Sequence, residues 1–413
     1  MDLEKNYDFH SYERRMNNLL KQIQRIAEPN RTLLLKYKQV SERQGLSLPR
    51  VHRLVSLMEY FARNCSKPFP DYEETDIDNA IELVHSKQRS NGTKELFRVA
   101  LIKFFEETVK KESLVEYIRK WKIVKSNSTK LPEELLTEEE VQKIIDACEN
   151  TRDRAICSLL WESGCRIGEI GNAKIKHLNF TGGEATLYLI GKTGARKVLL
   201  IGSVPHLKTW LQFHPHKENK EYALFTMVSI KERGKPVSYA CLRKMLSVVM
   251  QKAEINKKFN AHLWRHSRAT YLAGKLTEAQ LCSVMGWKIG SEMPSVYIHL
   301  NQKDIADSIR KIYGMGKKEK EEESIMKPRT CEFCGEVNVP TEKECTKCSN
   351  PLTLKDAINR YAKLEEVEQL KPQALATIEE LAGLVGQIGE RMKEMQGELR
   401  ELKGGRQEIK ARV

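Results

Sequence analysis

The sequence predicts a mainly α-helical protein with a small antiparallel β-sheet, followed by a four-cysteine ribbon and a C-terminal helix. Three observations lead to this fold class. Apolar residues recur at three- and four-residue spacings in residues 13–125 and again in 236–311, which is typical of helices packed on a core. The β-rich runs EATLYLI and RKVLLI flank the turn GKTGA, which predicts a hairpin. Beyond residue 330, two Cys-x2-Cys pairs precede a heptad repeat.

The first expected domain covers residues 1–125 and is all-helical. Its strongest pattern is RTLLLKYKQVSERQGLSLPRVHRLVSLMEYFARN, where the apolar spacing is interrupted at GLSLP, and TKELFRVALIKFFEETVKK forms a second unit. The polar stretch KIVKSNSTKLPEEL at residues 122–135 has two serines, a proline and no periodicity. We therefore expect a domain boundary there.

A second domain is expected over residues 126–316. It opens with LTEEEVQKIIDACEN, in which Thr137 and Glu140 have the spacing of a capping box. The stretch RDRAICSLLWESGCRIGEIGNAKI then predicts a buried helix, a turn at SGCR and another helix, ahead of the hairpin. The charged string KKEKEEES lies in a linker expected at 317–328.

The charge of the chain favours a polyanionic partner. The 413 residues carry a formal net charge of +14. Residues 1–130 hold 25 basic and 18 acidic residues, and residues 131–330 hold 32 and 23, so the surplus lies in the two expected domains. This is typical of nucleic-acid-binding proteins, although a merely solvated surface gives the same count. No apolar run approaches the ~20 residues of a membrane helix, and the first residues are too polar for a signal peptide, so we expect a cytoplasmic protein without a membrane partner.

A set of reactive side chains lies in the second domain. Tyr297, in MPSVYIHL, would on its own be a core or interface residue, because that is where tyrosines usually lie. Other residues of the same expected domain change this interpretation. Two arginines, a lysine, a histidine and an indole join the phenol: Arg166, Lys192, His262, Arg265 and Trp287.

These side chains are the parts needed to break and rejoin a phosphodiester without a metal. Guanidinium groups match the non-bridging phosphate oxygens with paired donors and stay charged. A phenol with a pKa of about 10 is a weak nucleophile until a base takes its proton, and histidine can do so near neutral pH. A lysine near the phosphate can supply the proton that the leaving oxygen needs.

The motifs SGCRIGEI, LIGKTGARKVLLI, HLWRHSRATYL and MGWKIGSEMPSVYIHL resemble, in that order, those of the tyrosine recombinase (phage integrase) family. The resemblance covers about residues 13–313, with the specific motifs in 160–300, and the wording around Trp287 and Tyr297 resembles archaeal integrases. It implies a helical core-binding (DNA-clamp) domain at 1–125 and a catalytic integrase domain at 126–316, closing on double-stranded DNA. Each motif alone is weak, whereas the ordered set is specific.

The resemblance also implies a role for each residue. Arg166 and Arg265 clamp the phosphate, and His262 is the general base. Tyr297 is the nucleophile, and Trp287 stands where most members of the family carry histidine. Lys192 is the hairpin general acid, although Lys197 competes for that role.

Other roles remain open on the sequence alone. Trp287 fits a core position as well as a phosphate contact. His266, beside Arg265, suits helix packing, and Glu169 suits a structural partner of a basic group.

The cysteines divide into two classes. Six are scattered singly, which suggests a reducing compartment and not a disulfide framework. The segment CEFCGEVNVPTEKECTKC predicts a structural zinc ribbon at residues 329–352, because two Cys-x2-Cys turns can present four thiolates tetrahedrally. A redox pair is the alternative. The expected ligands are Cys331, Cys334, Cys345 and Cys348.

The last segment, residues 353–413, is expected to be a helical coiled-coil tail. Apolar residues recur every seven positions in two series, at 378, 385, 392 and 399 and at 381, 388, 395 and 402. Glycines at 383, 386, 389 and 397 weaken that helix by up to ~1 kcal/mol each. An amphipathic helix folded onto its own domain is the alternative.

The function predicted from these patterns is a site-specific DNA recombinase or integrase with a 3′-phosphotyrosyl intermediate, acting as a homo-tetramer on paired sites. A strand-passing enzyme like topoisomerase IB would use nearly the same residues. A DNA-binding protein that keeps the fold without cleaving is a third possibility.

Overall fold

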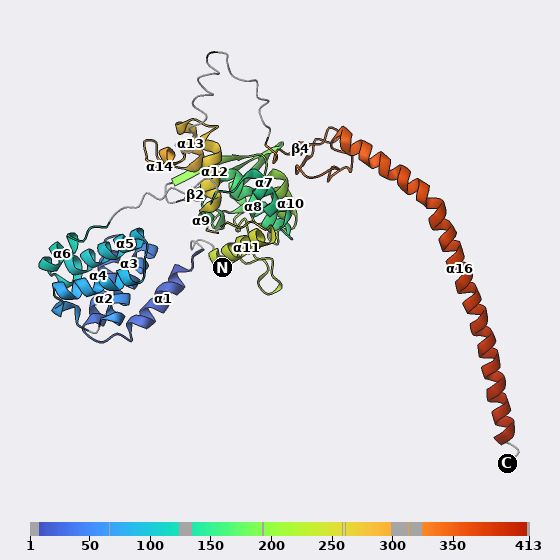
Figure 1. The fold of residues 1–413 in the computed structure, drawn as a ribbon, viewed down its shortest axis with the longest axis horizontal. Helices are drawn as coiled ribbons and strands as arrows, with labels where there is room; N and C mark the ends of the chain where they lie inside the picture. Colours follow the sequence, from blue (N-terminus) through green and yellow to red (C-terminus); the bar gives the residue numbers. More distant parts are fainter. Residues whose placement is uncertain are drawn as a thin grey trace. The chain divides into compact units, whose positions relative to one another are not determined.

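The computed structural model describes residues 8–65, 67–123, 134–191, 194–257, 259–260, 262–298, 313 and 324–410 (Figure 1). The chain divides into two compact units, residues 1–326 and 327–413. The described part of the first unit contains two large hydrophobic cores, one within residues 16–118 and one formed by Phe9 with residues 135–326, and a third, small core around Tyr297.

The first core belongs to a purely helical domain. Aromatic side chains fill it, and Phe61, Phe69, Phe97 and Phe104 are each at most 1% exposed. The helices are α1 (Tyr12–Ile23), α2 (Asn30–Arg43), α3 (Leu48–Asn64), α4 (Glu74–Ser86), α5 (Asn91–Phe104) and α6 (Glu112–Arg119), with a 3-10 turn at Phe69–Asp71 and a π-helical turn at Phe105–Val109. This confirms the helical fold expected before residue 125.

The second core is built by helices around a three-stranded sheet. The helices are α7 (Glu138–Asp146), α8 (Thr151–Ser163), α9 (Ile167–Gly171), α10 (Val204–Gln212), α11 (Tyr239–Lys252), α12 (Leu263–Ala273), α13 (Glu278–Met285) and α14 (Met293–Ile298), with 3-10 turns at Ile175–His177 and Ile230–Glu232. The predicted capping box forms at α7, where Thr137 N–H donates to Glu140 Oε2 at 2.9 Å and Glu140 N–H donates to Thr137 Oγ1 at 3.3 Å.

The sheet contains the predicted hairpin and one further strand. Its order is β1 (Leu178–Thr181), β2 (Glu184–Gly191) and β3 (Gly194–Leu200), all antiparallel. Alternate residues of β2 and β3 face the core, among them Leu187 and Leu200, whereas Tyr188 and Leu199 on the other face are 44% and 56% exposed. This period of two fixes which hairpin side chains can reach the interior.

One residue from before α1 packs in the second core. Phe9 is 2% exposed and accepts a hydrogen bond at 3.1 Å from the backbone N–H of Tyr239, at the start of α11. An added Cβ at Gly171 would lie 2.2 Å from the Phe9 ring, so the last residue of α9 has to be small. The N-terminal segment is therefore packed against the helix that follows Arg166.

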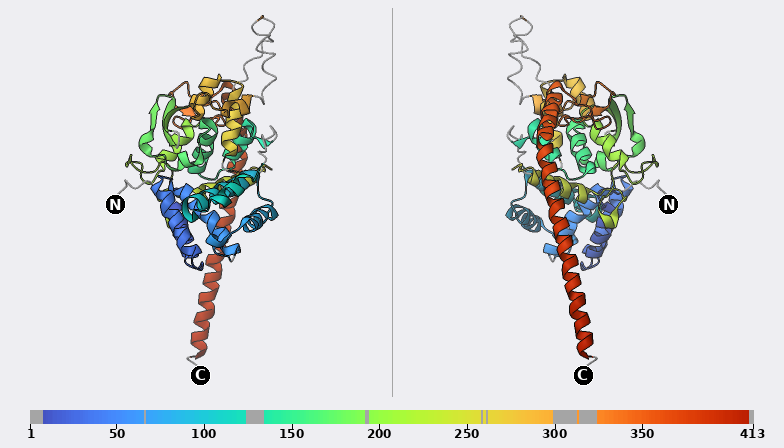
Figure 2. Two further views of the ribbon diagram at one scale, coloured as in Figure 1. Left: turned by 90° about the vertical axis from the view of Figure 1, so that its left-hand side faces the viewer. Right: turned by 90° about the vertical axis from the view of Figure 1, so that its right-hand side faces the viewer.

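The second unit is a small ribbon followed by one helix. The strands β4 (Arg329–Thr330) and β5 (Val337–Asn338) pair antiparallel, and α16 (Leu354–Lys410) follows. Figures 1 and 2 show α16 as one continuous helix. Within the described part of the chain, no helix is long and apolar enough to cross a membrane.

Candidate active site

Arg166 is positioned by a tight turn between two helices. α8 ends at Ser163, and Gly164 then adopts a left-handed conformation with φ +54°. A Cβ at Gly164 would lie 3.0 Å from Met285 Sδ, so both the backbone angle and the space favour glycine there. Arg166 immediately precedes α9, and its side chain is 30% exposed.

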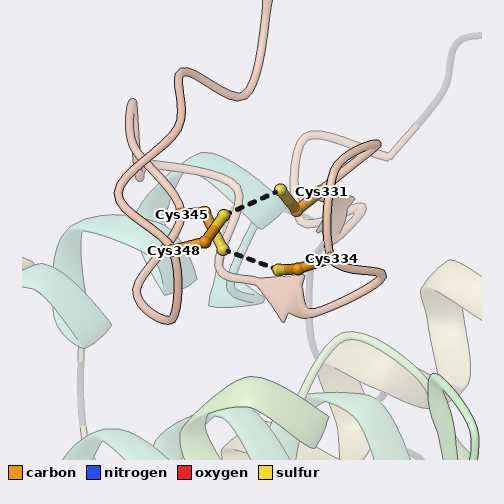
Figure 3. A group of neighbouring side chains, drawn as sticks. All are labelled: Cys331, Cys334, Cys345 and Cys348. Atoms are coloured by element: carbon orange, nitrogen blue, oxygen red, sulfur yellow. Dashed lines mark hydrogen bonds between the residues drawn. The ribbon is translucent and has the colours of Figure 1, made fainter.

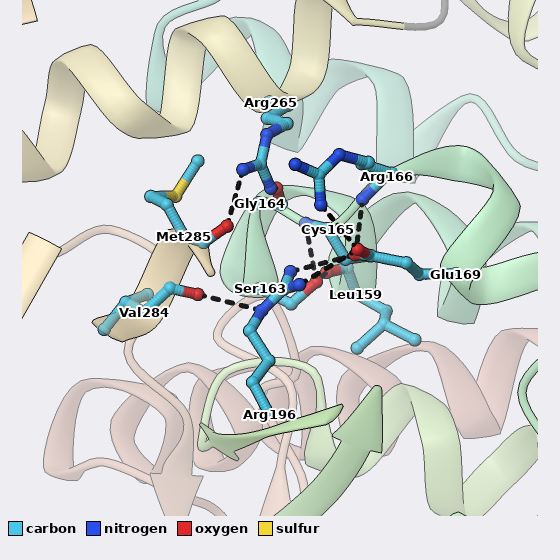
Figure 4. A network of polar contacts seen from close by, with 10 residues as sticks. All are labelled: Leu159, Ser163, Gly164, Cys165, Arg166, Glu169, Arg196, Arg265, Val284 and Met285. Carbon is cyan, nitrogen blue, oxygen red and sulfur yellow. Dashed lines mark hydrogen bonds and ion pairs between the residues drawn. The ribbon is translucent and has the colours of Figure 1, made fainter. Parts of the chain in front are cut away.

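Glu169, one turn along α9, is the centre of a buried polar network (Figure 4). Its side chain is 3% exposed and accepts four hydrogen bonds. Two come from Arg166, through the backbone N–H and Nη1, both at 2.9 Å. Two come from Arg196, through Nη1 at 3.0 Å and Nη2 at 2.9 Å. With its lone pairs occupied in this way, Glu169 is a structural partner of the arginines, as expected.

Arg196 is a member of this network that the sequence did not single out. It lies on β3, its side chain is 10% exposed, and its Nε also donates to the carbonyl of Val284 at 3.1 Å. A Cβ at Gly286, just after α13, would lie 2.9 Å from Arg196 Cδ. Arg196 therefore links the hairpin, α9 and the end of α13.

Arg265 is held by backbone carbonyls at the ends of two helices. Nη1 donates to Gly164 O at 2.8 Å and Nη2 donates to Met285 O at 2.5 Å. Carbonyls after the last turn of a helix lack intrahelical partners and carry the negative end of the helix dipole. They fix the orientation of the guanidinium of Arg265, a residue that is 6% exposed, without neutralising its charge.

The site has a surplus of positive charge. Burial lowers the pKa of Arg265 to about 10, and the charges of Arg166 and Arg196 act in the same direction. Burial opposes ionisation of Glu169, but the hydrogen bonds and charges of Arg196 and Arg166 hold its pKa below the ordinary value. At neutral pH three guanidinium groups therefore surround one carboxylate, an arrangement that suits an anion with several oxygens.

Tyr297 lies in a small core of its own. It is 3% exposed on α14 and packs with Leu272, Leu281 and Met285 from α12 and α13. Burial raises the pKa of its phenol, which the charge of Arg265 partly offsets. Tyr297 is thus a packed residue whose phenol loses its proton less readily than in water.

Trp287 contacts both the phenol and an arginine. Its ring stacks on Tyr297 with centroids 5.3 Å apart and planes at 12°. Arg265 Cζ lies 5.5 Å from the Trp287 ring centroid. The structure therefore brings together four residues of the predicted set, Arg166, Arg265, Trp287 and Tyr297.

His262, just before α12, and His266, within it, differ in their contacts. His262, at the start of the helix, is exposed, and its backbone N–H donates to Asn260 Oδ1 at 2.9 Å. His266 Nδ1 lies 2.6 Å from Tyr297 Oη. The packing role expected for His266 therefore does not describe it fully, because it contacts the predicted nucleophile.

The hairpin carries the two candidate lysines, Lys192 and Lys197. Lys192 lies outside the described residues. It follows Gly191, where an added Cβ would lie 2.5 Å from Glu169 Oε1, so the hairpin backbone is close to Glu169 at that point. Lys197 is exposed on β3, on the face opposite to Arg196, because neighbouring strand residues alternate between faces.

The four cysteines of the ribbon lie together (Figure 3). Their sulfur atoms are all within 4.8 Å of one another, with Cys331–Cys348 at 3.6 Å and Cys334–Cys345 at 3.5 Å. Each Cys-x2-Cys pair lies on a tight turn. Gly335 N–H donates to Cys331 O in the first turn, and Ser349 N–H donates to Cys345 O in the second. This cluster can bind a metal ion.

The comparison with known sequences gives one consistent family. Residues 134–304 match the phage integrase family. The tyrosine recombinase XerA of Pyrococcus horikoshii is 26% identical over 192 residues, which cover 45% of this chain and 65% of that protein. The tyrosine recombinase XerC of Actinobacillus succinogenes is 24% identical over 178 residues, which cover 42% and 58%. The chain thus spans less than two thirds of the length of these relatives.

Solved structures agree on the fold. A lambda integrase tetramer bound to a Holliday junction matches with a TM-score of 0.50 and 16% identity, covering 64% of this chain and 76% of that one. The Tn1549 transposon integrase in complex with circular intermediate DNA matches with a TM-score of 0.52 and 16% identity, covering 67% and 98%. The ordered motifs and the cationic cluster lie within residues 134–304, the part of the chain that is similar to the phage integrase family.

Proposed function

We propose that this protein is a site-specific DNA recombinase that cleaves and rejoins DNA strands through a 3′-phosphotyrosyl intermediate. The observation that carries the proposal is the cluster of Arg166 and Arg265, held by Glu169, Arg196 and the end of α13, near Tyr297. The relatives named as tyrosine recombinases support the same reaction.

The reaction follows from the chemistry of these groups. Arg166 and Arg265 bind the non-bridging oxygens of the scissile phosphate and stabilise the charge that develops there. Tyr297 Oη attacks the phosphorus as it loses its proton to a histidine, a role that the family motif assigns to His262, just before α12. The bond to the 5′ oxygen breaks, and that oxygen takes a proton from Lys192. The phosphotyrosyl ester then reacts with an incoming 5′ hydroxyl.

The decisive experiment is the isolation of a covalent protein–DNA adduct on a nicked suicide substrate, which on cleavage loses the short fragment that carries the freed 5′ hydroxyl and cannot be rejoined. We expect an adduct that resists denaturation and maps to the peptide containing Tyr297. Transfer of the trapped strand to a different partner duplex distinguishes a recombinase from a strand-passing enzyme. Binding of DNA with no adduct would mean that the protein keeps the fold without cleaving.

Lys192→Ala should slow cleavage of an ordinary substrate and be rescued by a 5′-thiol leaving group, which hardly needs a proton. Lys197→Ala is the matched control from the same hairpin. The exposed position of Lys197, opposite Arg196, favours Lys192 as the acid. Single-turnover cleavage rates of both variants on both substrates measure this, and rescue of Lys197→Ala alone would transfer the role to Lys197.

We further propose that the ribbon binds Zn²⁺ in a structural role. Four thiolates around Zn²⁺ at about 2.3 Å have sulfur–sulfur separations of ~3.8 Å, close to the 3.5 and 3.6 Å of this cluster. All four ligand positions are filled by protein, so the metal would support the fold and not the chemistry.

Cys331→Ser or chelation should unfold the segment 331–348 and leave the catalytic domain folded, because so short a ribbon has little core without a metal. Metal analysis of the purified protein should find about one zinc per chain in the wild type. The control Cys241→Ser, a cysteine outside the cluster, should keep that zinc, whereas Cys331→Ser should lose it. Wild-type protein without bound metal would contradict the assignment.

The working assembly that we propose is a homo-tetramer on two paired double-stranded DNA sites. The lambda integrase structure is a tetramer on a Holliday junction, which supports this assembly. The tail supplies a seam for contacts between protomers. Val385, Ile388, Met392 and Met395 are 57–68% exposed along α16, at the two predicted heptad positions.

Truncation after residue 352 should preserve cleavage of a single site and reduce pairing of two sites, because a tethered contact raises the effective concentration of protomers. The double variant Val385→Asp and Ile388→Asp should have the same effect within the full chain, while Gln387→Asp, outside the seam, should not. Sedimentation with and without DNA measures the assembly. Equal assembly by the full-length and truncated proteins would assign the heptads another role.

A further inference from the structure

The contact between Tyr297 and His266 connects the candidate nucleophile to a basic group to which no role has been assigned. Tyr297 Oη and His266 Nδ1 are 2.6 Å apart, and the two ring centroids are 5.9 Å apart with planes at 30°. This separation is at the short end for a hydrogen bond between a hydroxyl and a ring nitrogen. In the tautomer of His266 that carries its hydrogen on Nε2, Nδ1 can accept the phenol hydrogen of Tyr297.

Packing fixes both partners of this contact. Tyr297 is 3% exposed, and its ring packs against Trp287, just after α13, and in one core with Leu272 of α12 and Met285 of α13. His266 follows Arg265 on α12, and the guanidinium of Arg265 is tied to two carbonyls. His266 therefore lies on the same helix as Arg265, and the hydrogen bonds of Arg265 hold that helix against the ends of α8 and α13.

His262 is less well placed for the same task. It is exposed at the start of α12, and its ring centroid is 6.2 Å from that of His266. The two histidines lie four residues apart and so share a face of the helix. An exposed histidine at that end suits contact with arriving DNA, whereas the inner one contacts the phenol.

We propose that His266, and not His262, is the immediate acceptor of the Tyr297 proton during strand cleavage, with His262 left to contact the phosphate. This inference rests on the proposed function. In the step, the Tyr297 O–H bond breaks and its proton passes to His266 Nδ1 as Oη forms a bond to phosphorus. The bond from phosphorus to the 5′ oxygen breaks, and that oxygen leaves with its electron pair and takes a proton from Lys192. On rejoining, His266 returns its proton to Tyr297.

The burial of Tyr297 makes a general base beside its phenol necessary. Burial raises the pKa of Tyr297, so the free phenolate is scarcer than in water, and attack has to be coupled to proton transfer. A general base within hydrogen-bond reach typically contributes ~10²–10⁴-fold to rate. Nδ1 accepts the proton in the tautomer that carries its own hydrogen on Nε2.

The test uses two substitutions of the same residue in the full-length protein, on the nicked suicide substrate under single-turnover conditions. His266→Asn keeps an oxygen acceptor near the position of Nδ1 but removes the basicity. His266→Ala opens the space of the ring, which added imidazole can occupy. We expect cleavage by His266→Asn to fall ~100-fold or more with DNA binding and unfolding temperature unchanged, and imidazole to restore His266→Ala in part.

Two outcomes would overturn the inference. Wild-type cleavage rates in His266→Asn would show that an acceptor without basicity is sufficient, so that His266 only positions Tyr297. A loss in His266→Ala that imidazole does not restore would point to the same positioning role. Either result leaves the proposed function standing, since the wild-type protein still forms its adduct, whereas absence of any wild-type adduct would defeat the proposed function itself.

Discussion

Tyr297→Phe should abolish the covalent protein–DNA adduct while leaving the fold and DNA binding intact. Only the hydroxyl is removed, and the phenylalanine ring can keep the stack on Trp287 and the packing against Leu281 and Met285. The substitution loses one hydrogen bond, to His266, which typically contributes about 1 kcal/mol to stability. The nucleophile has no substitute, so the adduct should disappear altogether.

Denaturing gel analysis on the suicide substrate measures the adduct, and a mobility shift on an intact duplex measures binding. Tyr313→Phe is the matched control, because Tyr313 is another tyrosine near the end of the domain and is 76% exposed. It should form the adduct normally. A covalent complex with Tyr297→Phe would mean that another residue attacks the phosphorus, and the assignment of α14 as the nucleophile helix would then be wrong.

The parts of the site that were predictable from sequence are those fixed by local patterns. The turn SGCR ends one helix and starts another, so Arg166 has to lie at the junction, and the structure has Gly164 left-handed there. The capping box of Thr137 and Glu140 depends on residues three apart and formed as predicted. The Cys-x2-Cys pairs likewise bring their own ligands together through short turns.

The missed residues depend on how distant elements pack. Arg196 stands among several basic residues of GKTGARK, and only the register Leu189↔Arg196 shows that it faces inward while Lys197 faces out. A strand shifted by one residue would exchange the two. His266 offered a weak signal, because it lies four residues after His262 and shares its helix face. Its contact with Tyr297 forms because α14 packs on α12, and no local sequence pattern predicts that packing.

Replacement of Arg265 should produce the second large loss of activity. The residue contributes both a charge and a rigid fork of donors, and two of its N–H groups are already used to fix its orientation. Loss of one preorganised donor to a developing oxyanion costs ~10²–10³-fold in rate. Arg265→Ala should lose at least that much, since it removes the charge and every donor at once.

Arg265→Ala also leaves the carbonyls of Gly164 and Met285 without their partner in a buried place, which typically costs about 1–3 kcal/mol for each unsatisfied group. Some of its effect could therefore come from local unfolding. Arg265→Lys separates the two causes, because it keeps the charge and can still donate to one carbonyl but lacks the planar fork. We expect it to stay folded and bind DNA, yet to cleave ~100-fold or more slowly than wild type.

Arg268→Lys is the control from the same helix. Arg268 is half-buried, whereas Arg265 is buried. Its Nε donates to Glu162 O at 3.1 Å, and its guanidinium lies over the rings of Trp161 and Tyr271. Cleavage by this variant should stay close to wild type even if its stability falls, and single-turnover rates with thermal unfolding measure both. Equal cleavage by Arg265→Lys and wild type would show that a point charge is sufficient at this position. The proposal that Arg265 binds the phosphate through two hydrogen bonds would then be wrong. Arg166 would remain as the candidate for bidentate binding.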